Sequence, residues 1–222
     1  MSRRDWLAQM QRDWRQGQHV AVMGRTGRGK TSLARDLLAL RGWAVVLAIK
    51  RKDDTLETFP KAGYRIIRKW PPRWEDHRVV LWAKPKSMED MAEQRKQIAA
   101  VLNDVYANGG WAVLFDDVAR IANALGFKKW IATMLSEARS SHASIVSNMT
   151  QPSSVTQAIP SEVWRQVRYH LVFYYRVGRD LDAIADIVGY TRTELKKWMA
   201  QLGPWDFLAF DDLTDTVTVV RT

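Results

Sequence analysis

The 222-residue sequence predicts an α/β fold with a mainly parallel central sheet that helices cover on both faces. Short apolar segments typical of buried strands alternate with longer segments that have helical periodicity. Residues 18–50 read as strand, glycine-rich loop, helix and second strand, which is one βαβ unit. No repeat, low-complexity segment or long linker interrupts the chain. We therefore expect one domain, 1–222, with an N-terminal helix (1–17), a core (18–176) and a small helical and strand extension at the C-terminus (177–222).

The elements follow from apolar periodicity and from residues that stop helices. The clearest helix starts at Ser87, which is a suitable N-cap, has an acidic first turn, and ends at two glycines, 109–110. A basic segment, 50–73, predicts loops around a short strand. The expected helices are 4–16, 30–40, 87–108, 128–141, 179–188 and 191–201, with a short one before residue 169. The expected strands are 19–23, 43–50, 64–68, 78–84, 111–115, 143–149, 169–175 and 215–220.

A phosphate-binding loop lies between the first strand and its helix. The segment "GRTGRGKT", 24–31, has the spacing G-x-x-x-x-G-K-T, in which backbone N–H groups and a helix N-terminus surround phosphate oxygens. Lys30 is expected to reach the β- and γ-phosphates, and the Thr31 hydroxyl to hold Mg²⁺. The predicted ligands are therefore ATP and Mg²⁺. The predicted nucleotide-binding residues are Gly24, Arg25, Thr26, Gly27, Arg28, Gly29, Lys30, Thr31 and Ser32.

Polar residues follow two other strands at the edge where ligands bind in α/β sheets. Asp116 and Asp117 follow 111–115, and Gln151 follows 143–149. Asp116 is expected to hold Mg²⁺, and Asp117 to orient a water molecule, which favours hydrolysis over phosphoryl transfer to another acceptor. Asp117 has two alternatives, a solvated strand end or the N-cap of the next helix. The Gln151 amide can bond both water and the γ-phosphate.

Composition limits the partners. Lys and Arg number 34 against 24 Asp and Glu, a net charge of +10 that indicates a polyanionic partner. The absence of cysteine excludes disulfides and thiolate metal sites, and the four histidines have no ligand spacing. Most of the eleven tryptophans are expected in the core or in subunit contacts. No apolar run has the ~18–20 residues of a membrane span, and the charged start is unlike a secretory signal, so we expect a soluble, intracellular protein.

Three segments together resemble the FtsK/HerA superfamily of DNA-pumping ATPases. They are "GRTGRGKT", "VLFDD" and "EARSSHASIVSNMTQPSSV", and the resemblance covers residues 18–176. An Arg just before a strand that ends in Gln is the discriminating feature. The short chain is most similar to the genome-packaging ATPases of tailless, membrane-containing double-stranded DNA viruses. The resemblance implies a RecA-like P-loop NTPase core and ATP hydrolysis.

The resemblance also implies roles for individual residues. Gly24, Gly29, Lys30 and Thr31 would contact the phosphates and Mg²⁺, Asp116 would hold Mg²⁺, and Asp117 would activate water, although many relatives have Glu there. Gln151 would sense the γ-phosphate. Arg139 would be an arginine finger that reaches a neighbouring subunit's nucleotide, with Arg176 and Arg120 as weaker candidates. Arg139 also fits an ordinary cation near a helix C-terminus.

The implied function is the ATP-driven packaging of double-stranded DNA into a preformed viral capsid. Catalysis in trans requires a ring, with a hexamer favoured over a pentamer, and the DNA contacts would be independent of sequence. The capsid vertex or a virion membrane protein would anchor the ring, in the host cytoplasm or at the packaging vertex. The candidate DNA-binding residues are Lys50, Arg51, Lys52, Lys128 and Lys129.

Alternatives stay open. A conjugation or plasmid-transfer ATPase belongs to the same superfamily. A nucleoside or nucleotide kinase shares the size and the phosphate loop, but would be expected to have an Arg-rich lid. A DNA-binding accessory protein could use the nucleotide to regulate assembly without turnover. A GTPase is disfavoured because the N-K-x-D motif is absent.

Overall fold

A computed structural model describes residues 1–50, 55–84, 87, 91–137, 139–176 and 178–222 of the protein. Within these residues nine strands form one sheet in the order β3-β4-β2-β5-β6-β1-β7-β8-β9. The strands are β1 (Val20–Met23), β2 (Ala44–Leu47), β3 (Arg65–Ile67), β4 (Arg78–Leu81), β5 (Ala112–Phe115), β6 (Ser144–Met149), β7 (Tyr169–Phe173), β8 (Phe207–Asp211) and β9 (Thr216–Val220).

The sheet is mostly parallel. Every neighbouring pair from β3 to β7 is parallel, whereas β8 and β9 are antiparallel to their neighbours and extend the sheet beyond β7. In the register, Met23 at the end of β1 pairs with Met149 of β6. Phe115 at the end of β5 pairs with Ser147 of β6. The carboxyl ends of β1, β5 and β6 therefore meet at one edge, where their loops begin.

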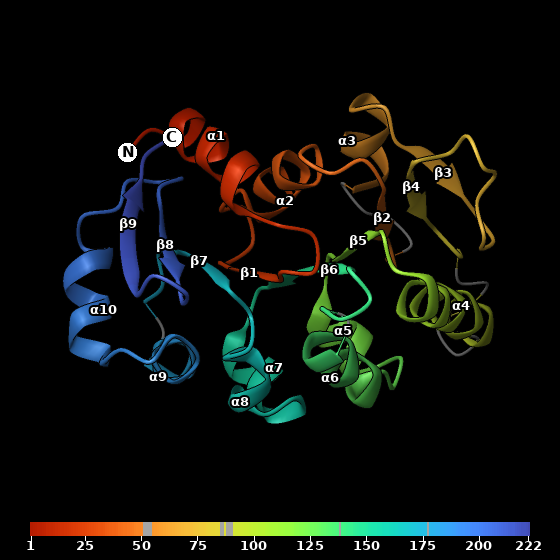
Figure 1. Cartoon of the computed structure of the whole chain (residues 1–222). Coiled ribbons are helices and arrows are strands. Elements are labelled where there is room, and N and C mark those ends of the chain that lie inside the picture. The colour runs from red at the N-terminus through yellow and green to blue at the C-terminus, as the bar shows by residue number, and fades with distance from the viewer. Residues whose placement is uncertain (51–54, 85–86, 88–90, 138, 177) are drawn as a thin grey trace.

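Helices cover both faces, as Figure 1 shows, with α1, α2 and α3 on one side and α4 to α10 on the other. Side chains of β1 alternate between the two layers: Val20 and Val22 belong to the core with α1 and α2, and Ala21 and Met23 to the opposite core. The helices are α1 (Arg3–Asp13), α2 (Lys30–Leu38), α3 (Thr55–Lys61), α4 (Ala92–Asn108), α5 (Val118–Asn123), α6 (Lys128–Glu137), α7 (Pro152–Ala158), α8 (Ser161–Trp164), α9 (Gly178–Val188) and α10 (Arg192–Met199).

Several elements differ from the sequence prediction. Helix α4 begins at Ala92 with Met91 at its N-cap, so Ser87 does not cap it. The structure adds α3, α5, α7 and β8. Helix α3 lies in the charged segment expected to be loops and contains Pro60, which is unfavourable in a helix interior. Strand β8 is held by pairing with β7, which lies more than 30 residues earlier in the chain, and with β9, which follows it. These pairings are not visible in the local sequence.

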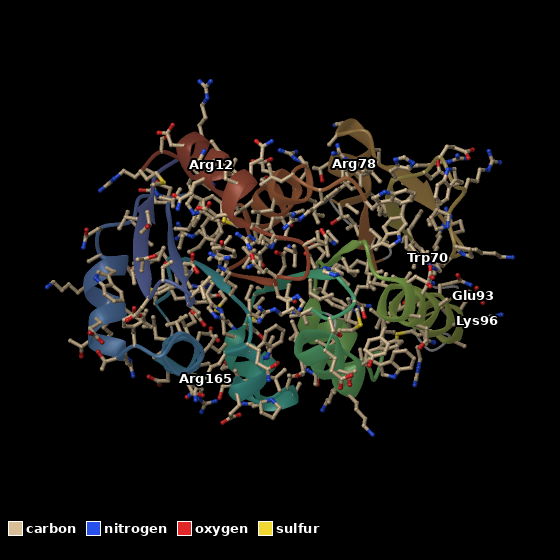
Figure 2. The ribbon with its side chains drawn as sticks, in the orientation of Figure 1. Arg12, Trp70, Arg78, Glu93, Lys96 and Arg165 are labelled. Atoms are coloured by element: carbon tan, nitrogen blue, oxygen red, sulfur yellow. The ribbon has the colours of Figure 1, made fainter. Side chains whose placement is uncertain are left out.

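Contacts between distant segments hold the outer parts of the fold together. The two termini lie side by side (Figure 1), and the Arg3 N–H donates to the Arg221 carbonyl at 2.8 Å. On the other side of the molecule Trp70 anchors the segment after β3 against α4 (Figure 2), since its indole Nε1 donates to Asp104 Oδ2 at 2.7 Å. No helix in the described residues is both long and apolar enough to span a bilayer.

Candidate nucleotide-binding site

The phosphate loop connects β1 to α2 through two glycines in the left-handed backbone region. Gly27 has a φ of +79° and Gly29 a φ of +88°, and a side chain at either position would be strained. Gly29 is also the N-cap of α2, so the first N–H groups of this helix face the loop. A backbone of this shape can act as a cradle for an anion such as phosphate.

Lys30 is a buried cation at the centre of the cradle. The residue is 8% exposed, and its Nζ donates to the Arg25 carbonyl at 3.2 Å. Burial lowers the pKa of Lys30 from 10.5 to about 8, an effect that attraction to Asp116 opposes and repulsion from Lys50 reinforces. Within the protein, the Lys30 ammonium group has a neutral carbonyl as its hydrogen-bond partner and attraction to Asp116 opposes the effect of burial only in part. A bound phosphate would add the negative charge that stabilises this cation.

Three side-chain donors surround Asp116. Thr31 Oγ1 and Asn148 Nδ2 donate to Asp116 Oδ1 at 3.3 Å and 2.8 Å, and Thr55 Oγ1 donates to Oδ2 at 2.7 Å. The carboxylate and the two hydroxyls are the hard oxygen donors that Mg²⁺ prefers, and the Thr31 pairing joins the two predicted ligands directly. In the described residues no group of three or more His, Cys, Asp or Glu could hold a metal. Mg²⁺ beside phosphates needs only one or two such ligands, so the residues fit the ion.

Asp117 is the N-cap of α5. Its Oδ1 accepts the Arg120 N–H at 3.2 Å, and its Oδ2 forms an ion pair with Lys50 Nζ at 3.4 Å. The geometry therefore matches the N-cap alternative. A water-activating role would require the carboxylate to exchange its Lys50 contact for a water molecule. Lys50, a candidate DNA-binding residue, also lines the phosphate pocket described next.

The surrounding pocket has a volume of about 390 Å³, within the range of about 300–1,000 Å³ typical of ligand pockets. It contains six of the nine predicted nucleotide-binding residues and both predicted metal ligands, together with side chains from α3 and from the turn before β8, whereas Gly24, Arg25 and Arg28 do not line it. The lining residues are Thr26, Gly27, Gly29, Lys30, Thr31, Ser32, Arg35, Lys50, Thr58, Asp116, Thr150 and Trp205.

Gln151 lies in a neighbouring hollow on the other side of the phosphate loop. This hollow, of about 560 Å³, is lined by Arg25, Thr26, Arg28, Thr150, Gln151, Ser153, Arg179 and Asp180. Gln151 is exposed, immediately before α7. Arg28 is directed toward the C-terminal extension, because its Nη1 donates to the Pro204 carbonyl at 3.0 Å. Gly24 packs against β7, and a Cβ there would lie 3.0 Å from Phe173.

Arg139 lies at the opposite, amino edge of the sheet. It precedes β6 and lines two hollows with residues that precede β1 and β7, among them Gln18 and Arg168. The length of the strands therefore separates Arg139 from the phosphate pocket of its own chain. Arg120 and Arg176 are exposed and follow β5 and β7, on the same edge as the phosphate loop.

The candidate DNA-binding residues divide into three places. Lys128 and Lys129 are exposed at the start of α6, Lys50 lies in the phosphate pocket, and Arg51 and Lys52 lie outside the described residues. A further groove of about 570 Å³, which four cations and Glu93 line, lies between the start of α4 and the segments that follow β3 and β4. Its basic residues are Arg68, Lys69, Lys84 and Lys96, the last labelled on α4 in Figure 2.

Five residues of the site were not predicted from the sequence: Arg35, Thr55, Thr58, Asn148 and Trp205. Asn148 had a usable signal, since "SNM" places polar residues in a strand that is otherwise buried, and Asn148 is 2% exposed. Thr55 and Trp205 had none, because their segments adjoin the phosphate loop only through tertiary packing.

No protein-family model and no curated protein matches the sequence. Solved structures do match. The DNA-packaging ATPase B204 from Sulfolobus turreted icosahedral virus is 16% identical, with 92% of this chain and 97% of that chain covered and a TM-score of 0.67. The genome-packaging NTPase B204 from Sulfolobus turreted icosahedral virus 2, in complex with ATP-gammaS, is 16% identical over 92% and 96%, with a TM-score of 0.64.

VirB4 of Thermoanaerobacter pseudethanolicus is 10% identical, with 91% of this chain and 88% of that chain covered and a TM-score of 0.68. At these identities the likeness establishes the fold. It confirms the mainly parallel α/β fold that the sequence predicts, because the chain shares its fold with the viral DNA-packaging ATPase B204 and with VirB4.

Proposed function

We propose that this chain is an ATPase that moves double-stranded DNA and packages a viral genome into a preformed capsid. The observation that carries the proposal is the convergence of Lys30, Thr31 and Asp116 on one pocket, in a fold shared with a viral DNA-packaging ATPase over nearly the whole of both chains. Thr31 and Asp116 would hold a Mg²⁺ ion, and such an ion neutralises charge on the phosphates when it is bound.

The chain's own groups would then act on the terminal phosphate. Lys30 Nζ would exchange the Arg25 carbonyl for a phosphate oxygen, and the N–H groups of the loop would bind the remaining oxygens. Asp117 would orient the attacking water and accept its proton. Gln151, beside the loop, would bond the γ-phosphate after a movement from its exposed position.

Arg139 would complete the site of a neighbouring subunit. Its place at the amino edge, away from the nucleotide pocket of its own chain, supports action in trans. Action in trans requires a closed ring, for which we favour a hexamer over a pentamer. An arginine supplied from a neighbour is worth roughly 10³–10⁵ in rate. Hydrolysis would therefore depend on assembly.

Exposed cations would contact the DNA backbone without reading its sequence. Lys128, Lys129 and the groove beside α4 are the described candidates, and Arg51 and Lys52 remain candidates by sequence. The ring would be anchored at a capsid vertex or by a virion membrane protein, in the host cytoplasm or at the packaging vertex.

A conjugation or plasmid-type DNA-pumping ATPase is the second candidate. The likeness to VirB4, with a TM-score of 0.68, favours it over a nucleoside or nucleotide kinase. All DNA-pumping candidates share one biochemical expectation, which is hydrolysis that depends on assembly and on DNA.

The test is ATP hydrolysis by the purified protein with and without double-stranded DNA, over a range of protein concentrations and at two salt concentrations. We expect a rate that rises cooperatively with protein and is stimulated by DNA of any sequence, with the stimulation lost at high salt. A rate linear in protein, indifferent to DNA and stimulated by a nucleoside acceptor would instead indicate a kinase.

Mixed rings test the role of Arg139. Arg139→Ala should bind ATP normally and hydrolyse it poorly, and mixing it with Asp117→Ala should restore part of the activity. Arg120→Ala and Arg176→Ala, at the carboxyl edge, are matched controls. If either arginine acts on the nucleotide of its own subunit, mixing that variant with Asp117→Ala should not restore activity. Mixed rings without any recovered hydrolysis would contradict action in trans.

A further inference from the structure

Trp205 brings the C-terminal extension into the phosphate pocket. It lies in the turn between α10 and β8, lines the pocket with Gly29 and Lys30, and is 56% exposed. A methyl group placed on Gly29 would lie 3.6 Å from Trp205 Cδ1, so the indole faces the open side of this glycine. The C-terminal extension therefore contributes Trp205 to the wall of the candidate site.

Hydrogen bonds fix the backbone on both sides of this indole. Asp206, 9% exposed, accepts the Gly203 N–H at 2.9 Å and the Thr222 N–H at 3.0 Å. Thr222 Oγ1 donates to the Trp205 carbonyl at 2.9 Å. The turn is tied to the phosphate loop itself through the bond from Arg28 to the Pro204 carbonyl. An exposed aromatic ring is thus held beside the loop by a fixed backbone.

Packing does not account for the exposed indole. Trp205 belongs to neither of the two hydrophobic cores. In the described part of the chain no aromatic ring packs on it, whereas Trp198, one helix earlier, packs edge-on against Tyr190 at a centroid distance of 5.1 Å. A large aromatic surface left open beside a concave polar pocket is typical of a ligand contact.

We propose that Trp205 is the stacking platform for the base of the bound nucleotide. The inference rests on the proposed function, which assigns residues to the phosphates and to Mg²⁺ but none to the base. Trp205 is the one aromatic residue among the described residues that line the pocket. Phosphates in the cradle and a base on the indole would occupy its two chemically different walls.

The proposal also predicts base selectivity. Stacking depends on ring area and is tolerant of base identity, because every base has a π face. Among the described lining residues the side chains are hydroxyls, cations, Asp116 and Trp205, with no amide to read a base edge. The site should therefore prefer purine to pyrimidine nucleotides and discriminate weakly between ATP and GTP.

The test compares Mg-ATP with Mg-tripolyphosphate, which carries the phosphates without a base, by isothermal titration calorimetry on the full chain. Trp205→Ala should weaken ATP binding about 5- to 150-fold, the range for the loss of one base–aromatic stack, and leave tripolyphosphate binding unchanged. Trp205→Phe, which keeps an aromatic ring, should stay within about threefold of the wild type. Trp205→Ala should also remove the preference for ATP over UTP.

The controls separate this proposal from the proposed function. Lys30→Ala should lose both ligands, and a wild type that binds neither would overturn the phosphate site together with the platform. If Trp205→Ala weakened both ligands equally, Trp205 would only support the phosphate loop. Unchanged ATP affinity in Trp205→Ala, with tripolyphosphate still bound, would overturn the platform alone. Thermal melts monitored by circular dichroism verify that each variant is folded.

Discussion

The two edges of the central sheet carry the same kinds of polar residue and use them differently. At the amino edge, Arg168 and Asp211 form a two-point ion pair, with both N–O distances 3.0 Å. At the carboxyl edge, Lys30 donates to a neutral carbonyl, and Asp116 is surrounded by neutral donors at the wall of a pocket. At the amino edge Arg168 and Asp211 neutralise each other, and at the carboxyl edge Lys50 pairs with Asp117. Lys30 and Asp116, in contrast, line a space that a charged ligand can fill.

The same substitution at both edges gives the largest expected contrast. Asp116→Asn keeps the shape of the side chain and removes the charge expected to hold Mg²⁺, so hydrolysis should fall about 10²–10³-fold. Asp211→Asn should keep hydrolysis within about threefold and lower the free energy of unfolding by about 1–2 kcal/mol, because it breaks a partly buried ion pair with Arg168.

Steady-state hydrolysis and urea unfolding of both variants measure this contrast. Similar losses of activity in the two variants would mean that the edges are not functionally distinct. A fully active Asp116→Asn protein would remove the metal site from the carboxyl edge.

A buried histidine at the amino edge should control acid stability. His19 is 3% exposed, and its Nδ1 accepts the Ile145 N–H at 3.1 Å, which requires the neutral ring. Burial lowers the pKa of His19 from 6.5 to about 4. The unfolded chain therefore binds the extra proton between these values, and stability should fall by on the order of 3 kcal/mol as the pH drops from about 6.5 to 4.

His19→Asn, whose amide oxygen can accept the same N–H, should flatten this acid limb in urea titrations at several pH values. His142→Asn is a matched control, since His142 has a φ of +52°, where Asn is well tolerated. An unchanged pH dependence in His19→Asn would show that other groups cause the acid loss.

Asn148 should act on hydrolysis through Asp116 as a positioning residue. Loss of its 2.8 Å hydrogen bond in Asn148→Ala frees one carboxylate oxygen to rotate, and we expect the Mg²⁺ concentration for half-maximal activity to rise about tenfold. The neighbouring Ser147→Ala, which removes a buried hydroxyl without a partner in the described residues, should leave the Mg²⁺ dependence unchanged. A lower maximal rate at the wild-type Mg²⁺ dependence would contradict the positioning role.

The difference between the edges also explains what the sequence could predict. The phosphate loop is continuous in sequence, and local apolar runs identify the parallel strands, so the fold class and the positions of Lys30, Thr31 and Asp116 were accessible. Thr55, which bonds Asp116, and Trp205, which lines the pocket, lie near β2 and β8, whose placement depends on long-range pairing. Asp117 was ambiguous because one carboxylate can both cap a helix and face a nucleotide.

The smallest expected effect concerns the stability of the nucleotide-free protein. Lys30→Met should abolish hydrolysis, because it removes the ammonium group expected to bind the phosphates. At pH 7 it should nevertheless raise the free energy of unfolding by about 1–2 kcal/mol, because burial disfavours the charged form of Lys30. The pKa is about 8 in the folded protein and 10.5 in the unfolded chain, which binds more protons between these values, so wild-type stability should rise with pH over that window. The gain in stability of Lys30→Met over the wild type should therefore be largest below pH 8 and decrease to near zero toward pH 10.5.

Lys128→Met, at an exposed lysine, should change stability by less than about 0.5 kcal/mol at any of these pH values. A destabilised Lys30→Met protein would show that the interactions of Lys30 with Asp116 and Arg25 outweigh its desolvation, and the carboxyl edge would then be as well compensated as the amino edge.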